Sequence, residues 1–206
     1  MYRLTYSLLL VMLFAVASFA QIANSDHDFS GTSWGSSEIC LPCHTPHNSD
    51  LTVSDAPLWN HEVTQADFTL YSSPTLNATI NLPSSNSKLC LSCHDGTVAL
   101  DNYGGNTGGT NFITGSALIG TDLSNDHPVS FVYNDALATA DGGLYPPSST
   151  SSGLGGMIED DLLFGDPDFS TLECASCHDA HNGYGNPSLL IISNAGSEFC
   201  LLCHDK

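Results

Sequence analysis

Basic residues are nearly absent from this 206-residue sequence. It contains three Lys and Arg residues against 22 Asp and Glu residues, and its formal net charge at pH 7 is −19. This imbalance makes nucleic acid an implausible partner, because a phosphate backbone repels an acidic protein. It also predicts a solvated acidic exterior.

Long apolar runs are absent after residue 20. The first 20 residues, MYRLTYSLLLVMLFAVASFA, contain one arginine, an apolar stretch and the small residues Ser18 and Ala20. This is the pattern of a secretory signal peptide. The apolar stretch is shorter than the ~20 residues that span a bilayer, which favours cleavage over an uncleaved anchor. We therefore expect a mature chain that begins at Gln21, is secreted through the periplasm and does not span the membrane.

Charged residues make up only 12% of the chain, whereas Gly, Ser, Thr and Asn are abundant. Long helices and a large aliphatic core are therefore not expected.

The eight cysteines all fall in four C-x-x-C-H motifs. Secreted cysteines commonly form disulfides, and paired C-x-x-C motifs also bind zinc. Neither alternative explains why a histidine follows the second cysteine in all four motifs, whereas covalent haem c attachment requires this spacing. Four haem c groups are predicted, attached through Cys40, Cys43, Cys90, Cys93, Cys174, Cys177, Cys200 and Cys203. The proximal iron ligands are then His44, His94, His178 and His204.

Polar residues before each motif suggest short capped helices. Ser37, Ser87, Thr171 and Ser197 each lie three residues before the first cysteine of a motif and are predicted N-caps. Ser170 and Glu173 form a possible capping box. In such a helix, residues i, i+3 and i+4 share one face, so both thiols and the histidine can reach one haem.

The two halves of the chain share one order of motifs: a lone histidine, then C-x-x-C-H-x-x-H, then a plain C-x-x-C-H. The lone histidines are His27 and His127, and the longer motifs end at His47 and His181. We interpret this order as a duplicated di-haem module, with residues 21–119 and 120–206 as the two modules of one tetrahaem unit.

The remaining histidines are candidates for the sixth iron ligands, and Met157 is the only alternative thioether in the mature chain. His47 lies too close to His44 to reach the far side of the same iron. We therefore expect His47 to bind the haem of Cys90 and Cys93. The equivalent residue, His181, is expected on the haem of Cys200 and Cys203, leaving His27 and His127 for the haems at Cys40/Cys43 and Cys174/Cys177. Exchange of these ligands within one protomer or between protomers stays open. His61 is expected to be a surface or hydrogen-bonding residue; haem ligation and a contact to a neighbouring subunit are the alternatives.

Several segments carry a family resemblance: CLPCHTPHN, APLWNH, CLSCHDGTVA, GTDLSNDHPVSF and CASCHDAHN. They resemble the paired C-x-x-C-H multihaem cytochromes, and the size with four haems is similar to outer-surface tetrahaem cytochromes of the OmcE type. This resemblance implies a fold of mostly irregular coil, with short α-helices at the haem-binding motifs, wrapped around a continuous chain of four bis-histidine haems. It also implies polymerisation into a conductive extracellular filament or nanowire. It also implies end-to-end haem contacts between subunits, with a histidine donated from one subunit to the next, His27 being the first candidate and His61 the second.

The favoured function is electron transport without substrate chemistry, so the chain is not expected to be an enzyme. Its partners would be copies of itself, other redox proteins or extracellular acceptors. A soluble periplasmic shuttle is one alternative. A multihaem reductase is the other, but two lysines and no arginine in the mature chain argue against a site that holds an anion.

Overall fold

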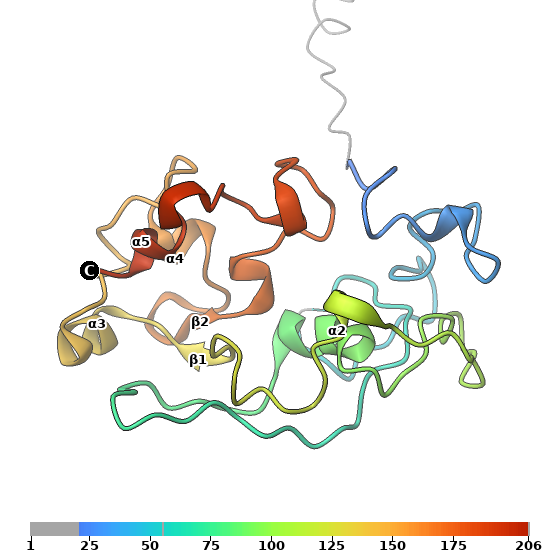
Figure 1. The fold of residues 1–206 in the computed structure, drawn as a ribbon, viewed down its shortest axis with the longest axis horizontal. Helices are drawn as coiled ribbons and strands as arrows, with labels where there is room; N and C mark the ends of the chain where they lie inside the picture. The colour runs from blue at the N-terminus through green and yellow to red at the C-terminus, as the bar shows by residue number, and fades with distance from the viewer. Residues whose placement is uncertain (1–20, 55, 206) are drawn as a thin grey trace, which may run out of the picture.

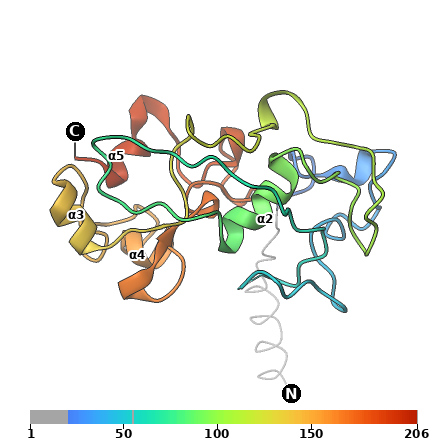
Figure 2. The same cartoon turned by 90° about the horizontal axis from the view of Figure 1, so that it is seen from below.

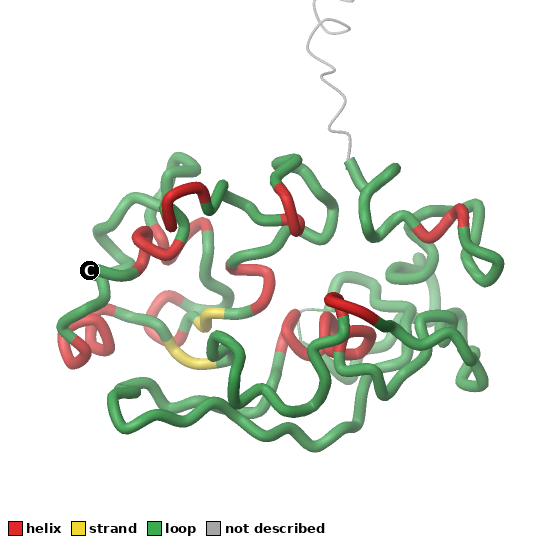
Figure 3. Tube along the Cα trace, viewed as in Figure 1, coloured by secondary structure: helices red, strands yellow, loops and turns green. Residues whose placement is uncertain are grey.

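The computed structural model describes residues 21–54 and 56–205. The predicted signal peptide lies outside the described residues. Turns and loops form most of the described chain, and its helices and strands are short (Figure 3). The expectation of a mostly irregular fold with a few short helices is thereby confirmed. The small two-stranded sheet was not predicted.

Within the described residues, the α-helices are α2 (Ser85–His94), α3 (Asp135–Asp141), α4 (Ile158–Asp161) and α5 (Cys200–Cys203). Single 3-10 turns are η1 (Phe29–Gly31), η2 (Gly115–Ala117), η3 (Pro167–Phe169), η4 (Cys174–Ser176), η5 (Pro187–Leu189) and η6 (Ala195–Ser197). Strands β1 (Phe131–Val132) and β2 (Thr171–Leu172) pair antiparallel, with Phe131 opposite Leu172.

Helix α2 occupies the middle of the molecule. The first described residues lie at one end, and α3, α4 and α5 lie towards the other (Figure 1). A view turned by 90° shows the same order (Figure 2). The second haem motif, at the end of α2, is therefore central in the arrangement.

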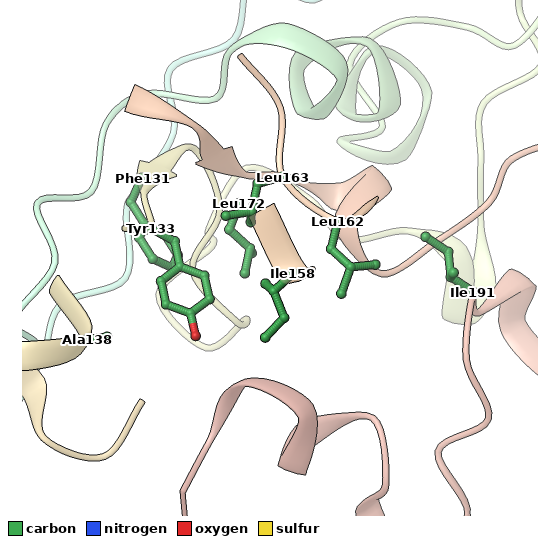
Figure 4. Packing of buried hydrophobic residues seen from close by; sticks show 8 residues of the cluster. All are labelled: Phe131, Tyr133, Ala138, Ile158, Leu162, Leu163, Leu172 and Ile191. Carbon is green, nitrogen blue, oxygen red and sulfur yellow. The ribbon is translucent and has the colours of Figure 1, made fainter. Parts of the chain in front are cut away.

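The larger apolar cluster is built around β1, β2, α3 and α4 (Figure 4). Its buried members are Phe131, Tyr133, Ala138, Ile158, Leu162, Leu163, Leu172 and Ile191. A second, smaller cluster contains Val53, Trp59, Val63 and Leu89. Both clusters are small, as the composition predicted, so aliphatic packing alone buries little apolar surface.

One segment of the first half crosses to the second. Ala78 and Ile80 pack against the larger cluster, and the Asn77 amide donates a hydrogen bond to the Asp141 carboxylate at 3.0 Å. Contacts therefore cross the boundary predicted at residues 119 and 120, and the division into two modules stays a prediction.

Helix α3 has a cap at each end. The Asn134 side chain accepts a hydrogen bond from the Leu137 amide at 3.0 Å. At the other end Gly142 adopts a left-handed conformation with φ of 69°, and its amide bonds to the Ala138 carbonyl. Neither cap was predicted, because α3 carries no haem motif. In the described ranges, no helix has the length and apolar character needed to cross a bilayer.

Candidate haem centres

Each C-x-x-C-H motif closes one helical turn. The backbone amides of His44, His178 and His204 donate to the carbonyl of the first cysteine of their motifs, at 2.9, 3.0 and 3.1 Å. The second motif forms the last turn of α2, which ends at His94. These turns bring both cysteines and the histidine of a motif to one face, as the spacing predicted.

The predicted caps of these turns are wrong. Helix α2 has Ser84 as its N-cap and contains Ser87 in its interior, while Glu173 caps η4 and Phe199 precedes α5. Ser37 caps nothing, because the first motif is a turn without a helix before it. The physical reason at two sites is a tertiary partner: the Ser87 and Thr171 hydroxyls both donate to the Glu173 carboxylate.

The other predicted caps fail for local reasons. Ser197 has a left-handed φ of 66° and ends η6. The capping box predicted for Ser170 and Glu173 is formed instead by Glu173 and Ser176, whose hydroxyl accepts from the Glu173 amide at 2.8 Å.

The second cysteine of every motif is enclosed. Burial raises the pKa of the Cys93 thiol to about 12 and the pKa values of Cys43, Cys177 and Cys203 to about 11. All eight cysteines are free of disulfides. Free thiols at this spacing, each pair followed by a histidine, fit thioether attachment of haem c.

Three proximal histidines are oriented by backbone carbonyls. The Nδ1 atom of His44 lies 2.6 Å from the Pro57 oxygen. The Nδ1 atoms of His94 and His178 lie 2.7 and 2.9 Å from the oxygens of Ala117 and Ser188. A carbonyl only accepts, so Nδ1 carries the proton and Nε2 keeps a free lone pair. This arrangement is typical of histidines that bind a metal through Nε2.

An apolar cavity of about 240 Å³ lies beside the third motif. Cys174, Cys177 and His178 line it together with the aliphatic residues Leu70, Ile80, Leu91, Ile119, Leu123, Val129 and Leu172. The combination of thioether-forming cysteines, an oriented imidazole and aliphatic walls fits a haem attached at Cys174 and Cys177.

The histidine rings form three close pairs from distant parts of the chain. His27 and His94 have ring centroids 6.1 Å apart, His44 and His181 are 6.0 Å apart, and His127 and His204 are 6.4 Å apart. A metal–imidazole bond is about 2 Å long, so two imidazoles on opposite sides of one metal have ring centres roughly 6 Å apart. Each pair joins one proximal histidine to one predicted sixth ligand.

The pairs differ from the expected assignment. His27 was expected opposite His44 but faces His94, and His181 was expected with the haem of Cys200 and Cys203 but faces His44. His127 lines the cavity beside His178, as expected, although its ring pairs with His204.

The position of the N-terminal arm, residues 21–31, explains why His27 faces His94. The His27 ring bonds to the Ala180 carbonyl at 3.1 Å. The Asn182 amide donates to the Gln21 carbonyl at 3.4 Å. These contacts hold the arm against the segment that follows the third motif. Burial lowers the pKa of His27, which favours the neutral imidazole that a metal requires.

The two other histidines have different surroundings. His61 is buried, with 3% of its surface exposed. Its two ring nitrogens lie 2.8 and 3.0 Å from the carbonyls of Glu62 and Ala99. His47, by contrast, is exposed. In the described part of the chain its ring contacts no other histidine. The assignment of His47 to the haem of Cys90 and Cys93 therefore stays a prediction.

Sequence reasoning missed the carboxylate behind the second motif. Asp95 follows His94 and has 4% of its surface exposed. It accepts hydrogen bonds from the hydroxyl of Thr64 at 2.5 Å and the amide of Thr97 at 2.7 Å. The sequence contained a signal, since Asp also follows the proximal histidine at Asp179 and Asp205.

These features define the class of protein: a chain that holds haem c covalently through C-x-x-C-H motifs. The model of one protein family, described as a doubled C-x-x-C-H motif, matches residues 167–206. The match supports a multihaem c-type cytochrome, and the motifs indicate covalently bound haem c. No curated protein matches the chain significantly.

Proposed function

We propose that this protein is a secreted tetrahaem cytochrome c that carries electrons outside the cell and polymerises into a filament. Haem c, when bound, supplies reversible one-electron chemistry at its iron. The proposal assigns one haem to each C-x-x-C-H motif. The chain's own residues would attach it, orient it and close its coordination sphere.

The observation that carries the proposal is the set of three imidazole pairs. An iron held by two histidines has no open position for a substrate, so such a site passes electrons without binding small molecules. This favours electron transport over a reductase. The acidic composition supports the same choice, because a chain with 22 acidic residues and three basic ones repels anionic substrates.

The surroundings of His178, the proximal histidine outside the three pairs, support the filament. No histidine ring contacts that of His178 among residues 21–54 and 56–205, while the exposed His47 has no histidine neighbour there. We infer that His47 of one copy binds the haem at Cys174 and Cys177 of the next copy. His27 was the first candidate for this role and His61 the second. His27 is favoured instead as an internal ligand of the haem at Cys90 and Cys93, and His61 as a buried hydrogen-bonding residue.

The first test is the composition and spin state of the purified mature protein. Intact mass is expected to show four covalent haems, and electron paramagnetic resonance of filaments is expected to show low-spin iron only. Fewer haems would contradict the tetrahaem assignment. A persistent high-spin iron in the assembled protein would favour a reductase, and strictly monomeric wild-type protein under the microscope would favour a periplasmic shuttle.

The second test concerns His47 and His27. His47→Ala is expected to load four haems but to stay monomeric in negative-stain microscopy, with one high-spin haem like that of dissociated wild-type protein. His27→Ala should add a second high-spin haem in the monomer, because it removes a ligand within the chain. Gln65→Ala, a change at an exposed residue outside the four motifs, is the control and should leave assembly and spectra unchanged. Filaments of His47→Ala with all four haems low-spin would show that His47 is not the donated ligand.

A further inference from the structure

Glu173 is a fully buried carboxylate at the junction of the second and third motifs. Its exposed fraction is 0%, and it directly precedes Cys174. The hydroxyls of Ser87, Ser130 and Thr171 donate to its oxygens at 2.5, 2.8 and 2.7 Å. The backbone at Ser176 adds a further donor through the cap of η4. These donors come from α2, from the residue before β1 and from β2.

The contacts of Glu173 are those of an ionised group. A carboxylate is an acceptor only, and the partners of both its oxygens are able to donate. Within the described residues no lysine or arginine pairs with it; the one ion-pair contact there joins His181 and Asp179. The hydrogen bonds thus satisfy the carboxylate while leaving its negative charge uncompensated.

The attachment points of two haems meet beside this charge. The Ser87 hydroxyl, which donates to Glu173, also accepts from the Cys174 amide at 2.9 Å. The Asn86 side chain accepts from the Ala175 amide at 3.2 Å. Glu173 therefore lies in one hydrogen-bonded unit with the attachment turns of both motifs.

We propose that Glu173 is a fixed negative charge that lowers the reduction potentials of the haems attached at Cys90/Cys93 and Cys174/Cys177. Reduction adds one electron to a haem, and a buried carboxylate repels that electron strongly because the surrounding dielectric constant is low. These two haems should therefore have lower reduction potentials than the haems at Cys40/Cys43 and Cys200/Cys203. The inference rests on the proposed function, since it requires haems at both motifs.

The test is a spectroelectrochemical titration of the haem-loaded protein, with individual haems assigned by their paramagnetic resonance signals. Glu173→Gln keeps the size and hydrogen-bonding capacity of the side chain and removes the charge. It is expected to shift the potentials of two haems upward and to leave the other two unchanged. Asp160→Asn, which removes the same charge from an exposed position in α4, is the matched control and should shift all potentials much less.

A second variant separates charge from structure. Glu173→Asp keeps the charge while altering the packing, and is expected to retain potentials near those of the wild type. Equal shifts in Glu173→Gln and Glu173→Asp would overturn the proposal, as would a Glu173→Gln shift no larger than that of Asp160→Asn.

The wild-type protein provides a measurement that does not depend on the folding of a variant. The haems at Cys90/Cys93 and Cys174/Cys177 are expected to have the two lowest potentials of the four. If they have the two highest, the proposal is wrong. Fewer than four haems, or a high-spin haem in the assembled wild type, would instead contradict the proposed function, so the two failures are distinguishable.

Discussion

Asp101 shows how single carboxylates fix the loops of this chain. Its oxygens accept hydrogen bonds from the Asn111 amide at 3.0 Å, the Asn111 side chain at 2.9 Å and the Thr110 amide at 3.3 Å. Burial alone would raise the pKa of Asp101, but the donors from Asn111 and Thr110 outweigh burial and lower it below 3.8. One side chain thereby closes the loop from residue 101 to residue 111.

This geometry predicts a pH-dependent contribution to stability. Because the folded-state pKa lies below the unfolded value, the stabilisation is present above the unfolded pKa of 3.8 and is lost as pH falls through the folded pKa. Asp101→Asn should lower the free energy of unfolding at pH 6. The difference from wild type should shrink at pH values below about 4. Urea unfolding at both pH values measures it, and a difference that grows on acidification would contradict the assignment.

At the scale of residues, the spacing of each motif predicts its attachment cysteines and its proximal histidine, because covalent attachment needs a fixed local geometry. The spacing does not predict which imidazole rings face each other. The facing of His27 and His94 depends on contacts with Ala180, far along the chain. The order of the motifs relates residues within each half of the chain. It therefore does not indicate contacts between residues as distant as His27 and Ala180.

At the scale of elements, helix α3 has a cap at each end and contains no haem motif. Asn134 accepts from the Leu137 amide, and Gly142 ends the helix in a left-handed conformation. The helix contributes Ala138 to the larger apolar cluster. Its caps are therefore a clean place to measure how much local backbone chemistry adds to this fold.

We expect Asn134→Ala to lower the free energy of unfolding by about 1 kcal/mol, since the Leu137 amide loses its acceptor. Gly142→Ala should cost a similar amount, roughly 1 kcal/mol, because a Cβ disfavours the left-handed conformation. Gly31→Ala is a useful comparison, since a Cβ at Gly31 meets no atom within 4 Å and should change stability little. Denaturant unfolding of the three haem-loaded variants checks the order, and equal effects at Gly142 and Gly31 would contradict it.

The elements themselves were only partly predictable. The helical turn of each motif follows from its spacing, but α2 begins well before its motif and Ser87 points into a tertiary hydrogen bond. Strands β1 and β2 contain two residues each, which is too short for a period-2 pattern to reveal. Their pairing places Phe131 opposite Leu172 within the larger cluster, and this too depends on residues distant in sequence.

At the scale of the whole molecule, the fold contains little aliphatic packing. The two apolar clusters are small, and loops dominate the chain. Several apolar side chains are exposed, including Leu58, Leu118 and Ile119, which lie next to the carbonyls or motif residues that surround His44 and His94. Porphyrin faces would cover such surfaces.

We therefore expect the chain produced without haem attachment to be largely unfolded. Circular dichroism should show loss of cooperative thermal unfolding, and limited proteolysis should cleave the haem-free chain far faster than the loaded protein. Variants with both cysteines of a single motif changed to alanine lose one haem attachment site. Their stability should lie between that of the loaded protein and that of the haem-free chain. A haem-free chain that unfolds cooperatively and resists protease would contradict this prediction.

The two hydrogen bonds between the N-terminal arm and the segment after the third motif have a consequence for biogenesis. Synthesis delivers residue 27 early, whereas its anchor at Ala180 arrives after most of the chain has been made. The His27 ring therefore cannot form its contact with Ala180 until nearly the entire polypeptide has been made. Maturation of the central centre is then a late event, and a prematurely terminated chain would leave that centre half-finished.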